Sequence, residues 1–130
     1  MTDDQPALLI VEDDESLRQI LARHLRSRGY RVEEAASAEE AVRSLEAGDR
    51  PDLVVLDINL PGDTGWDLLR GPAFEAAGSP PVVVASATTV RRGQLAEFAV
   101  AGYLPKPFPL DTLVETIERL LSKEDAPQHP

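Results

Sequence analysis

The stretch Ala7-Leu-Leu-Ile-Val11 runs directly into the acidic stretch Glu12-Asp13-Asp14-Glu15. A short apolar run with no polar residue on either face is typical of a strand that is buried on both sides of a sheet. The acidic residues end the run abruptly and predict a loop at the carboxyl end of that strand. Strands buried on both sides occur mainly in parallel sheets covered by helices, so this stretch favours an α/β fold.

A helical segment is predicted after each of the five predicted strands. After the first strand, apolar residues recur at the i, i+3, i+4, i+7 and i+8 spacing of one buried helix face, and Gly29 ends the helix. The residues on this face are Leu17, Ile20, Leu21, His24 and Leu25. Ser37 and Glu40 have the spacing of a capping box and predict a second helix that ends near Gly48.

The remaining helices are expected from about Trp66 onward and over residues 90–100 and 110–122, with Pro72 breaking or kinking the one near Trp66. Strands are predicted at residues 7–11, 31–35, 53–56, 82–85 and 102–104. This alternation predicts an α/β fold, namely a doubly wound five-stranded parallel sheet of order 2-1-3-4-5 with helices on both faces.

A length of 130 residues is the size of one domain, which we place at residues 7–122. Residues 1–6 are expected to form a flexible N-terminus. Residues 123–130 are polar and contain two prolines, so we expect a disordered tail or a linker stub there.

The composition narrows the possible functions. The 13 Lys and Arg residues are outnumbered by 23 Asp and Glu residues, which gives a net charge of −10 and argues against direct nucleic-acid binding by this chain. The absence of cysteine excludes disulfides and thiolate metal sites. The sequence shows no signal-peptide pattern and no apolar run long enough for a membrane span, so we expect a cytoplasmic protein without membrane contact.

Chemically active side chains follow four of the five predicted strands. In the order 2-1-3-4-5 the first and third strands are neighbours, so Glu12, Asp13 and Asp57 should converge. Carboxylates in such proximity repel one another, and Mg²⁺ is the cation best suited to stabilise them. Together with the ammonium of Lys106, this cluster suits a carboxylate that attacks phosphorus.

Each of these residues also has an ordinary structural interpretation. Asp13 and Asp14 are suitable caps for the following helix, Lys106 is compatible with an exposed surface position, and Tyr103 with a place in the core. His24 is expected to be a packed histidine without a chemical role. The joint placement of the acidic residues and the lysine at one sheet edge favours the phosphorus chemistry.

The strand ends resemble those of the receiver domains of bacterial two-component response regulators, which have the chemotaxis-type, flavodoxin-like fold. The resemblance extends from Leu8 to Leu121. It rests on four motifs in the same order, Val11-Glu12-Asp13-Asp14, Leu56-Asp57-Ile-Asn-Leu-Pro61-Gly62, Ser86-Ala87 and Lys106-Pro107-Phe108. Each motif alone is weak, but their order and context are together highly specific.

The resemblance implies a role for each matching residue. Asp57 would be the phospho-acceptor, and Mg²⁺ would be bound by Glu12, Asp13, Asp57 and the backbone carbonyl of Asn59. Lys106, Ser86 and Tyr103 would bind the phosphoryl group and transmit the switch, whereas Asn59 and Thr88 would tune the lifetime of the phosphate. The family also implies a cis peptide bond between Lys106 and Pro107, and proline makes such a bond inexpensive.

The resemblance further implies a signalling domain rather than an enzyme, one that assists its own phosphotransfer and slow autodephosphorylation. Its partners would be a sensor histidine kinase or phosphotransfer protein, and an unknown output protein or missing output domain. The predicted fourth helix is about two residues shorter than is usual in the family. The last helix carries Asp111, Glu115 and Glu118 where dimerising members tend to be basic, so we expect a monomer or weak dimer.

Two other functional classes remain open at this stage. One is a small Mg²⁺-dependent hydrolase with an aspartyl-phosphate intermediate, which is disfavoured because Asp57 is followed by Ile58 and Asn59 rather than by a second acid. The other is a phosphate-independent interaction module, which is disfavoured because every site residue is present. Turnover of phosphate esters would support the hydrolase. Normal partner binding by Asp57→Ala would support the interaction module.

Overall fold

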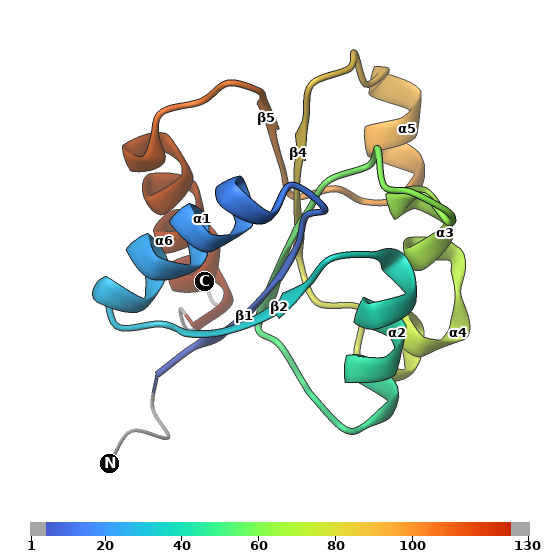
Figure 1. Cartoon of the computed structure of the whole chain (residues 1–130), viewed down its shortest axis with the longest axis horizontal. Coiled ribbons are helices and arrows are strands. Elements are labelled where there is room, and N and C mark those ends of the chain that lie inside the picture. The colour runs from blue at the N-terminus through green and yellow to red at the C-terminus, as the bar shows by residue number, and fades with distance from the viewer. Residues whose placement is uncertain (1–4, 126–130) are drawn as a thin grey trace, which may run out of the picture.

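The chain folds around a five-stranded, entirely parallel sheet of order β2-β1-β3-β4-β5 (Figure 1). The computed structural model describes residues 5–125, and it describes side chains as far as Ser122. The strands are β1 (Ala7–Val11), β2 (Arg31–Ala35), β3 (Leu53–Leu56), β4 (Val82–Ser86) and β5 (Gly102–Pro105). The predicted α/β class and strand order are confirmed.

The helices cover both faces of this sheet. They are α1 (Glu15–Ser27), α2 (Ala38–Glu46), α3 (Gly65–Arg70), α4 (Pro72–Ala76), α5 (Arg92–Glu97) and α6 (Leu110–Asp125). Helices α1 and α6 pack on one face, and α2 to α5 lie on the other (Figure 1). None of the helices in the described part of the chain is long and apolar enough to cross a bilayer.

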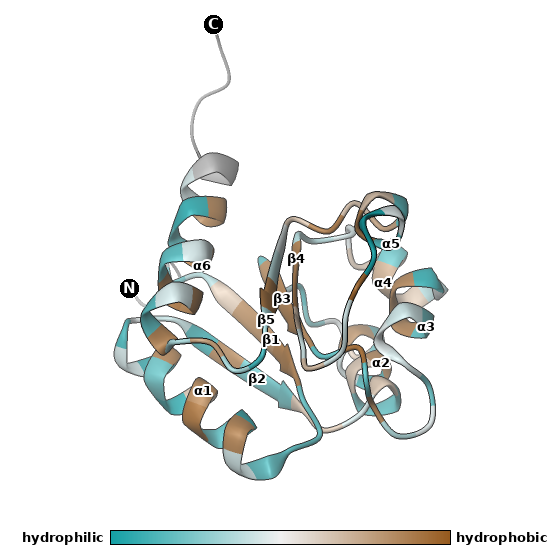
Figure 2. Ribbon diagram, turned by 90° about the horizontal axis from the view of Figure 1, so that it is seen from above, coloured by the Kyte–Doolittle hydropathy of each residue, from teal (hydrophilic) through white to brown (hydrophobic). Residues whose placement is uncertain are grey.

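The sheet separates two apolar cores because successive residues of a strand point to opposite faces. Leu8 and Ile10 of β1 pack with Leu25 of α1 and Ile117 of α6, whereas Leu9 belongs to the core under α2 to α5. Figure 2 shows the apolar colour concentrated on the central strands, with hydrophilic colour on outward parts of the helices. The apolar runs in the sequence are therefore strands buried on both sides.

The first two helices begin at polar caps. Asp14 is the N-cap of α1 and accepts a hydrogen bond from the backbone N–H of Leu17 at 3.1 Å. Ser37 caps α2 by accepting from the N–H of Glu40, also at 3.1 Å, as predicted. The Glu40 carboxylate accepts from the N–H of Ala36 at 2.7 Å, so it reaches one residue further back than the predicted box.

The third predicted helix is divided in two, as the proline suggested. Helix α3 ends at Arg70, and Pro72 occupies the first turn of α4, where a residue without an N–H is tolerated. A capping box between Thr64 and Asp67, which the sequence analysis did not identify, begins α3.

Several boundaries differ from the predicted ones. Helix α5 spans only Arg92–Glu97 rather than residues 90–100, and Ala99 just beyond it has a left-handed φ of 51° that an α-helix does not allow. Helix α6 continues to Asp125, three residues into the expected tail, while residues 1–4 and 126–130 lie outside the described part. Strands β4 and β5 each extend one residue further than predicted.

The prediction that Ile20 lies on the buried face of α1 is wrong. Its exposed fraction is 52%, whereas Leu21, Ala22 and Leu25 are buried. Ala22 belongs to the core, so the centre of the buried face lies further round the helix than the apolar spacing alone suggested. His24 is half-buried, and its Nε2 has no hydrogen-bond partner among the described residues.

Candidate functional site

Two buried carboxylates lie side by side at the carboxyl edge of the sheet. Glu12 follows β1 and is 3% exposed, and Asp57 follows β3 and is 5% exposed. The N–H of Glu12 donates to the carbonyl of Ala35 and the N–H of Asp57 to that of Val11, both at 3.0 Å. These bonds continue the sheet's hydrogen-bond pattern beyond β1 and β3, which fixes the positions of both acids.

A third carboxylate completes an acidic cluster. The exposed Asp13 offers a carboxylate oxygen that lies within 4.8 Å of oxygens from Glu12 and Asp57. Asp13 is free to face the cluster because Asp14, rather than Asp13, caps α1. The capping interpretation is therefore correct for Asp14, whose N–H also donates to the Glu12 carboxylate at 3.1 Å.

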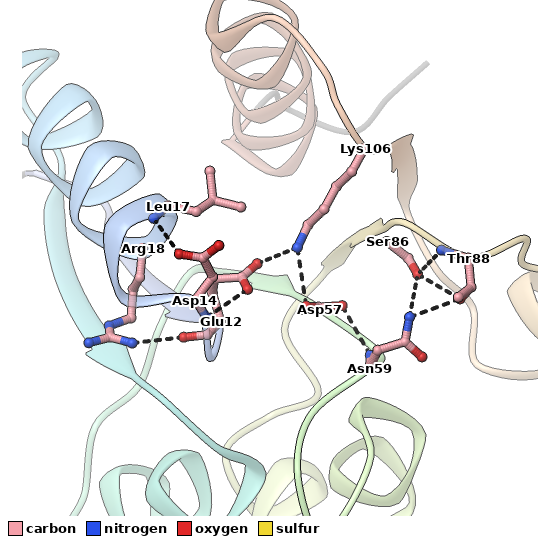
Figure 3. Close-up of polar contacts among 9 residues, drawn as sticks. All are labelled: Glu12, Asp14, Leu17, Arg18, Asp57, Asn59, Ser86, Thr88 and Lys106. Atoms are coloured by element: carbon pink, nitrogen blue, oxygen red, sulfur yellow. Dashed lines mark hydrogen bonds and ion pairs between the residues drawn. The ribbon is translucent and has the colours of Figure 1, made fainter.

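Lys106 reaches this cluster from the far edge strand (Figure 3). Its Nζ lies 2.6 Å from Oε1 of Glu12 and 3.1 Å from Oδ2 of Asp57. The backbone N–H of Lys106 donates to the carbonyl of Ser86 at 2.8 Å, which anchors the residue just beyond β5. The lysine side chain is only 18% exposed, so the interpretation of Lys106 as a free surface residue is wrong.

Burial and charge together determine the protonation of the pair formed by Glu12 and Lys106. Burial raises the pKa of Glu12, although hydrogen bonds from Lys106 and from the Asp14 amide act in the opposite direction. Burial alone would lower the pKa of Lys106, but the hydrogen bond to Glu12 and the negative charges of Asp57 and Glu12 outweigh it, so the pKa is raised. The lysine is therefore a permanent cation at neutral pH.

A second polar network lies beside Asp57. The N–H of Asn59 donates to Oδ1 of Asp57 at 3.0 Å, and its side-chain amide donates to Oγ1 of Thr88 at 2.9 Å. The hydroxyl of Ser86, on a fully buried residue, lies 3.1 Å from the hydroxyl of Thr88 and 3.4 Å from the Asn59 amide (Figure 3). The hydroxyl of Tyr103 donates to the backbone carbonyl of Thr88 at 3.4 Å.

Comparison with known proteins identifies the family to which this site belongs. Residues 8–118 match the response regulator receiver domain. The chain belongs to the response regulator receiver domain family. Its receiver domain accounts for most of the sequence, and the predicted resemblance is confirmed.

Curated relatives of this receiver domain are longer proteins. The transcriptional activator protein PfeR of Pseudomonas aeruginosa is 40% identical over 122 residues, which are 91% of this chain and 38% of PfeR. The response regulator MprA of Mycolicibacterium vanbaalenii is 36% identical, over 89% of this chain and 50% of MprA. The sensor kinase CckA of Brucella abortus is 38% identical, over 91% of this chain and 13% of the kinase. The chain thus spans half or less of each of these relatives.

Solved structures share the fold of this receiver domain. A CheY-like receiver domain protein from Methanospirillum hungatei superimposes with a TM-score of 0.86 at 25% identity, covering 94% of this chain and 98% of that one. The response regulator TrrA from Thermotoga maritima, solved in complex with Mg²⁺ and BeF, has a TM-score of 0.76 at 29% identity, covering 89% and 99% of the two chains. The chain is therefore a signalling domain of two-component systems.

The receiver site has the donor chemistry of a Mg²⁺ site. Each of the three side chains in the acidic cluster offers a carboxylate oxygen, the donor that a hard divalent cation prefers. The Lys106 ammonium contacts two of the three acidic side chains, Glu12 and Asp57, so a single positive charge serves three acidic groups. The acidic cluster therefore fits a bound divalent cation in both charge and donor type. The Asn59 carbonyl remains a predicted further ligand.

Two further predictions concern the peptide bond after Lys106 and the position of Tyr103. The peptide bond between Lys106 and Pro107 is cis, as predicted. Tyr103 is half-buried and packs against the core under α2 to α5, and its hydroxyl reaches the backbone carbonyl of Thr88. Its role as a reporter of the switch stays a prediction.

Sequence reasoning missed one residue that contacts the site, Arg18 of α1. Its guanidinium donates to the backbone carbonyl of Glu12 at 2.9 Å and also pairs with the Glu34 carboxylate at 3.2 Å (Figure 3 shows the first contact). The spacing along α1 gave no signal for this contact, because it depends on how α1 packs beside β2.

Proposed function

We propose that this receiver domain accepts a phosphoryl group on Asp57 from the phosphohistidine of a sensor histidine kinase or phosphotransfer protein. Bound Mg²⁺, held by Glu12, Asp13, Asp57 and the Asn59 carbonyl, would offset negative charge on the phosphoryl oxygens. The observation that carries the proposal is that the buried Asp57 carboxylate belongs to the acidic cluster and lies 3.1 Å from the Lys106 ammonium.

In the transfer step, a carboxylate oxygen of Asp57 forms a bond to phosphorus. The bond between phosphorus and the histidine nitrogen of the donor breaks, and that nitrogen keeps the electron pair. Lys106 stabilises the charge on the transferred group, because its ammonium already lies within hydrogen-bond distance of Asp57. These roles make the domain an assistant to its own phosphorylation rather than an enzyme with a separate substrate.

The hydroxyl network beside Asp57 supports a route for the switch. The Ser86 hydroxyl is fully buried, and its partners among the described residues are all neutral, so a phosphoryl oxygen on Asp57 offers it a stronger, charged acceptor. Movement of Ser86 toward that acceptor would disturb its contact with Thr88, whose carbonyl holds the Tyr103 hydroxyl. Tyr103 would then change orientation and alter the surface around β5.

We also assign the control of phosphate lifetime to Asn59 and Thr88. The two side chains are joined at 2.9 Å beside the Asp57 carboxylate, so together they limit the approach of water to that group. In slow autodephosphorylation, water would attack phosphorus, the bond between phosphorus and the Asp57 oxygen would break, and inorganic phosphate would leave the regenerated carboxylate.

The proposed partners follow from this chemistry. One is the phosphohistidine donor, and the other is an output protein or an output domain outside this sequence. Helix α6 exposes three acidic residues, Asp111, Glu115 and Glu118, which repel the same helix of a second copy. The proposal therefore includes a monomer or weak dimer. We place its action in the cytoplasm.

Intact mass spectrometry after incubation with a small acyl phosphate tests the proposal. We expect one phosphoryl adduct per chain that requires Mg²⁺ and disappears in Asp57→Asn. The matched control is Asp63→Asn, an exposed aspartate in the loop after the same strand, which should be labelled normally.

Other results of the labelling experiment would lead to different conclusions. Normal labelling of Asp57→Asn would overturn the assignment of the acceptor. If no adduct forms, beryllofluoride binding distinguishes two cases, since a folded protein that binds it has a competent but rapidly hydrolysing site. A folded protein that binds neither would be a phosphate-independent interaction module.

A further inference from the structure

Arg18 connects the acidic cluster to the edge of the sheet. Its side chain is 15% exposed, and it uses two different nitrogens. Nη1 donates to the carbonyl of Glu12 at 2.9 Å, and Nε pairs with Oε1 of Glu34 at 3.2 Å. Glu34 belongs to β2 and is held from its other oxygen by Arg26, also at 3.2 Å. The Arg18 guanidinium is therefore fixed at both ends.

The carbonyl that Arg18 holds lies within the peptide bond that joins Glu12 to Asp13. The N–H of Glu12 is already fixed by the Ala35 carbonyl, and its side chain by Lys106 and the Asp14 amide. Asp13 is exposed, and its carboxylate has no such partners among the described residues. Its direction therefore depends on the orientation of the peptide that precedes it.

We infer that Arg18 is a positioning residue for the divalent-cation site, which it serves by fixing the peptide between Glu12 and Asp13. Arg18 does not touch the cation or the phosphoryl group. It orients the exposed carboxylate of Asp13 toward those of Glu12 and Asp57 before the cation binds. This inference rests on the proposed function, because it concerns the same Mg²⁺ site.

Charge and orientation predict opposite effects when Arg18 is removed. A guanidinium beside an acidic cluster repels a cation, so the loss of its charge alone would strengthen Mg²⁺ binding. The loss of a group that orients a metal ligand weakens binding, typically by about 10-fold to 100-fold. A weaker affinity in the variant can therefore not be explained by charge.

The test is the dissociation constant for Mg²⁺, measured by titration calorimetry of the whole chain with Mg²⁺ alone. Arg18→Met keeps the length of the side chain and removes both donors, and we expect its dissociation constant to rise by about 10-fold. At saturating Mg²⁺ the rate of labelling by acyl phosphate should stay within about twofold of the wild type, because Asp57 and Lys106 are unchanged.

Arg26→Met is the matched control. Arg26 is another α1 arginine on the same Glu34 carboxylate, and its side chain makes no contact with Glu12. We expect its Mg²⁺ dissociation constant to stay within about twofold of the wild type. A rise equal to that of Arg18→Met would overturn the inference, as would an unchanged constant in a folded Arg18→Met protein.

Glu34→Ala keeps the inference testable if Arg18→Met does not fold. This change releases Arg18 from β2 without altering any group in the acidic cluster. It should raise the dissociation constant by a smaller factor than Arg18→Met does, because Arg18 can still donate to the Glu12 carbonyl. An unchanged constant in this variant would overturn the inference. If the wild-type protein itself binds no Mg²⁺, the proposed function fails, whereas normal wild-type binding with unaffected variants defeats only the role of Arg18.

Discussion

The Nζ of Lys106 lies 2.6 Å from Oε1 of Glu12, although the two residues are 94 positions apart in the sequence. The distance from the same nitrogen to Asp57 is longer, at 3.1 Å. The lysine therefore pairs more closely with Glu12 than with the predicted acceptor Asp57, and both acids belong to the predicted cation site. The ammonium and a divalent cation would both neutralise the Glu12 carboxylate, so they should compete for it.

Replacing Lys106 with methionine should strengthen Mg²⁺ binding. The change removes a positive charge from the acidic cluster but keeps a side chain of similar length. Because hydrogen bonds to charged groups contribute about 1.5–3 kcal/mol, we expect the affinity to rise by at least about tenfold. Titration calorimetry measures this directly, and a weaker affinity would show that the lysine orders the site instead of competing with the cation.

The same variant should separate phosphorylation from the switch. We expect Lys106→Met to acquire a phosphoryl adduct with Mg²⁺, since Asp57 and the acidic cluster remain. Without the ammonium to hold the phosphoryl group, the resonances of Tyr103 in NMR spectra should change less than they do in the wild type. A wild-type shift of Tyr103 in the phosphorylated variant would contradict the role of Lys106 in transmission.

Two adjacent aspartates should have separable effects. Asp14→Ala removes the N-cap of α1 and should lower the free energy of unfolding by about 1 kcal/mol, while Mg²⁺ still binds. Asp13→Ala should weaken Mg²⁺ binding by at least about tenfold with little loss of stability, because Asp13 is exposed. Urea unfolding and calorimetry on both variants check the assignment, and an exchange of the two phenotypes would reverse it.

Gly65→Ala should damage the site through the backbone. A Cβ at this position would lie 2.8 Å from the Asp57 carbonyl oxygen and 3.0 Å from Cα of Ile58. We expect a loss of about 1–3 kcal/mol in the free energy of unfolding, together with slower labelling of Asp57. Gly93→Ala is the control, since its Cβ would meet nothing within 4 Å and alanine favours the helix α5.

The cap of α3 should lose its contribution in acid. Hydrogen bonds from the backbone N–H and the hydroxyl of Thr64 lower the pKa of Asp67 from its ordinary value of 3.8, and Arg70 lowers it further. A carboxylate with a lowered folded-state pKa stabilises the fold above its unfolded pKa, and that stability is lost as the pH falls through the folded value. The stability difference between wild type and Asp67→Asn should therefore shrink below about pH 4. Urea unfolding between pH 3 and 6 measures it, and a constant difference would contradict the assigned pKa shift.

The strands were the most predictable part of the fold because burial on both sides leaves an unbroken apolar run. Strands β1, β2 and β3 begin and end where the sequence predicted. The site was predictable for a related reason, since parallel strands place their carboxyl ends at one edge and so bring Glu12, Asp57 and Lys106 together.

The features that escaped prediction depend on packing between elements. The contact of Arg18 with the Glu12 carbonyl requires α1 and β2 to be already in place, and no spacing in the sequence encodes that. Ile20 has an apolar side chain but faces outward, because the small residue Ala22 belongs to the core instead. The length of α5 was also overestimated, since apolar residues continue through Val100 although the helix ends at Glu97.

The long sequence separation within the site has a consequence for the growing polypeptide. The contacts of Lys106 reach back 49 and 94 residues, and β5 occupies the last position in the sheet beside β4. A ribosome-bound chain that contains only the first three strands already carries Asp57 but lacks the ammonium that faces it. Such a chain therefore lacks one of the groups that face Asp57, and the site is completed only after β5 has been made and added to the sheet beside β4.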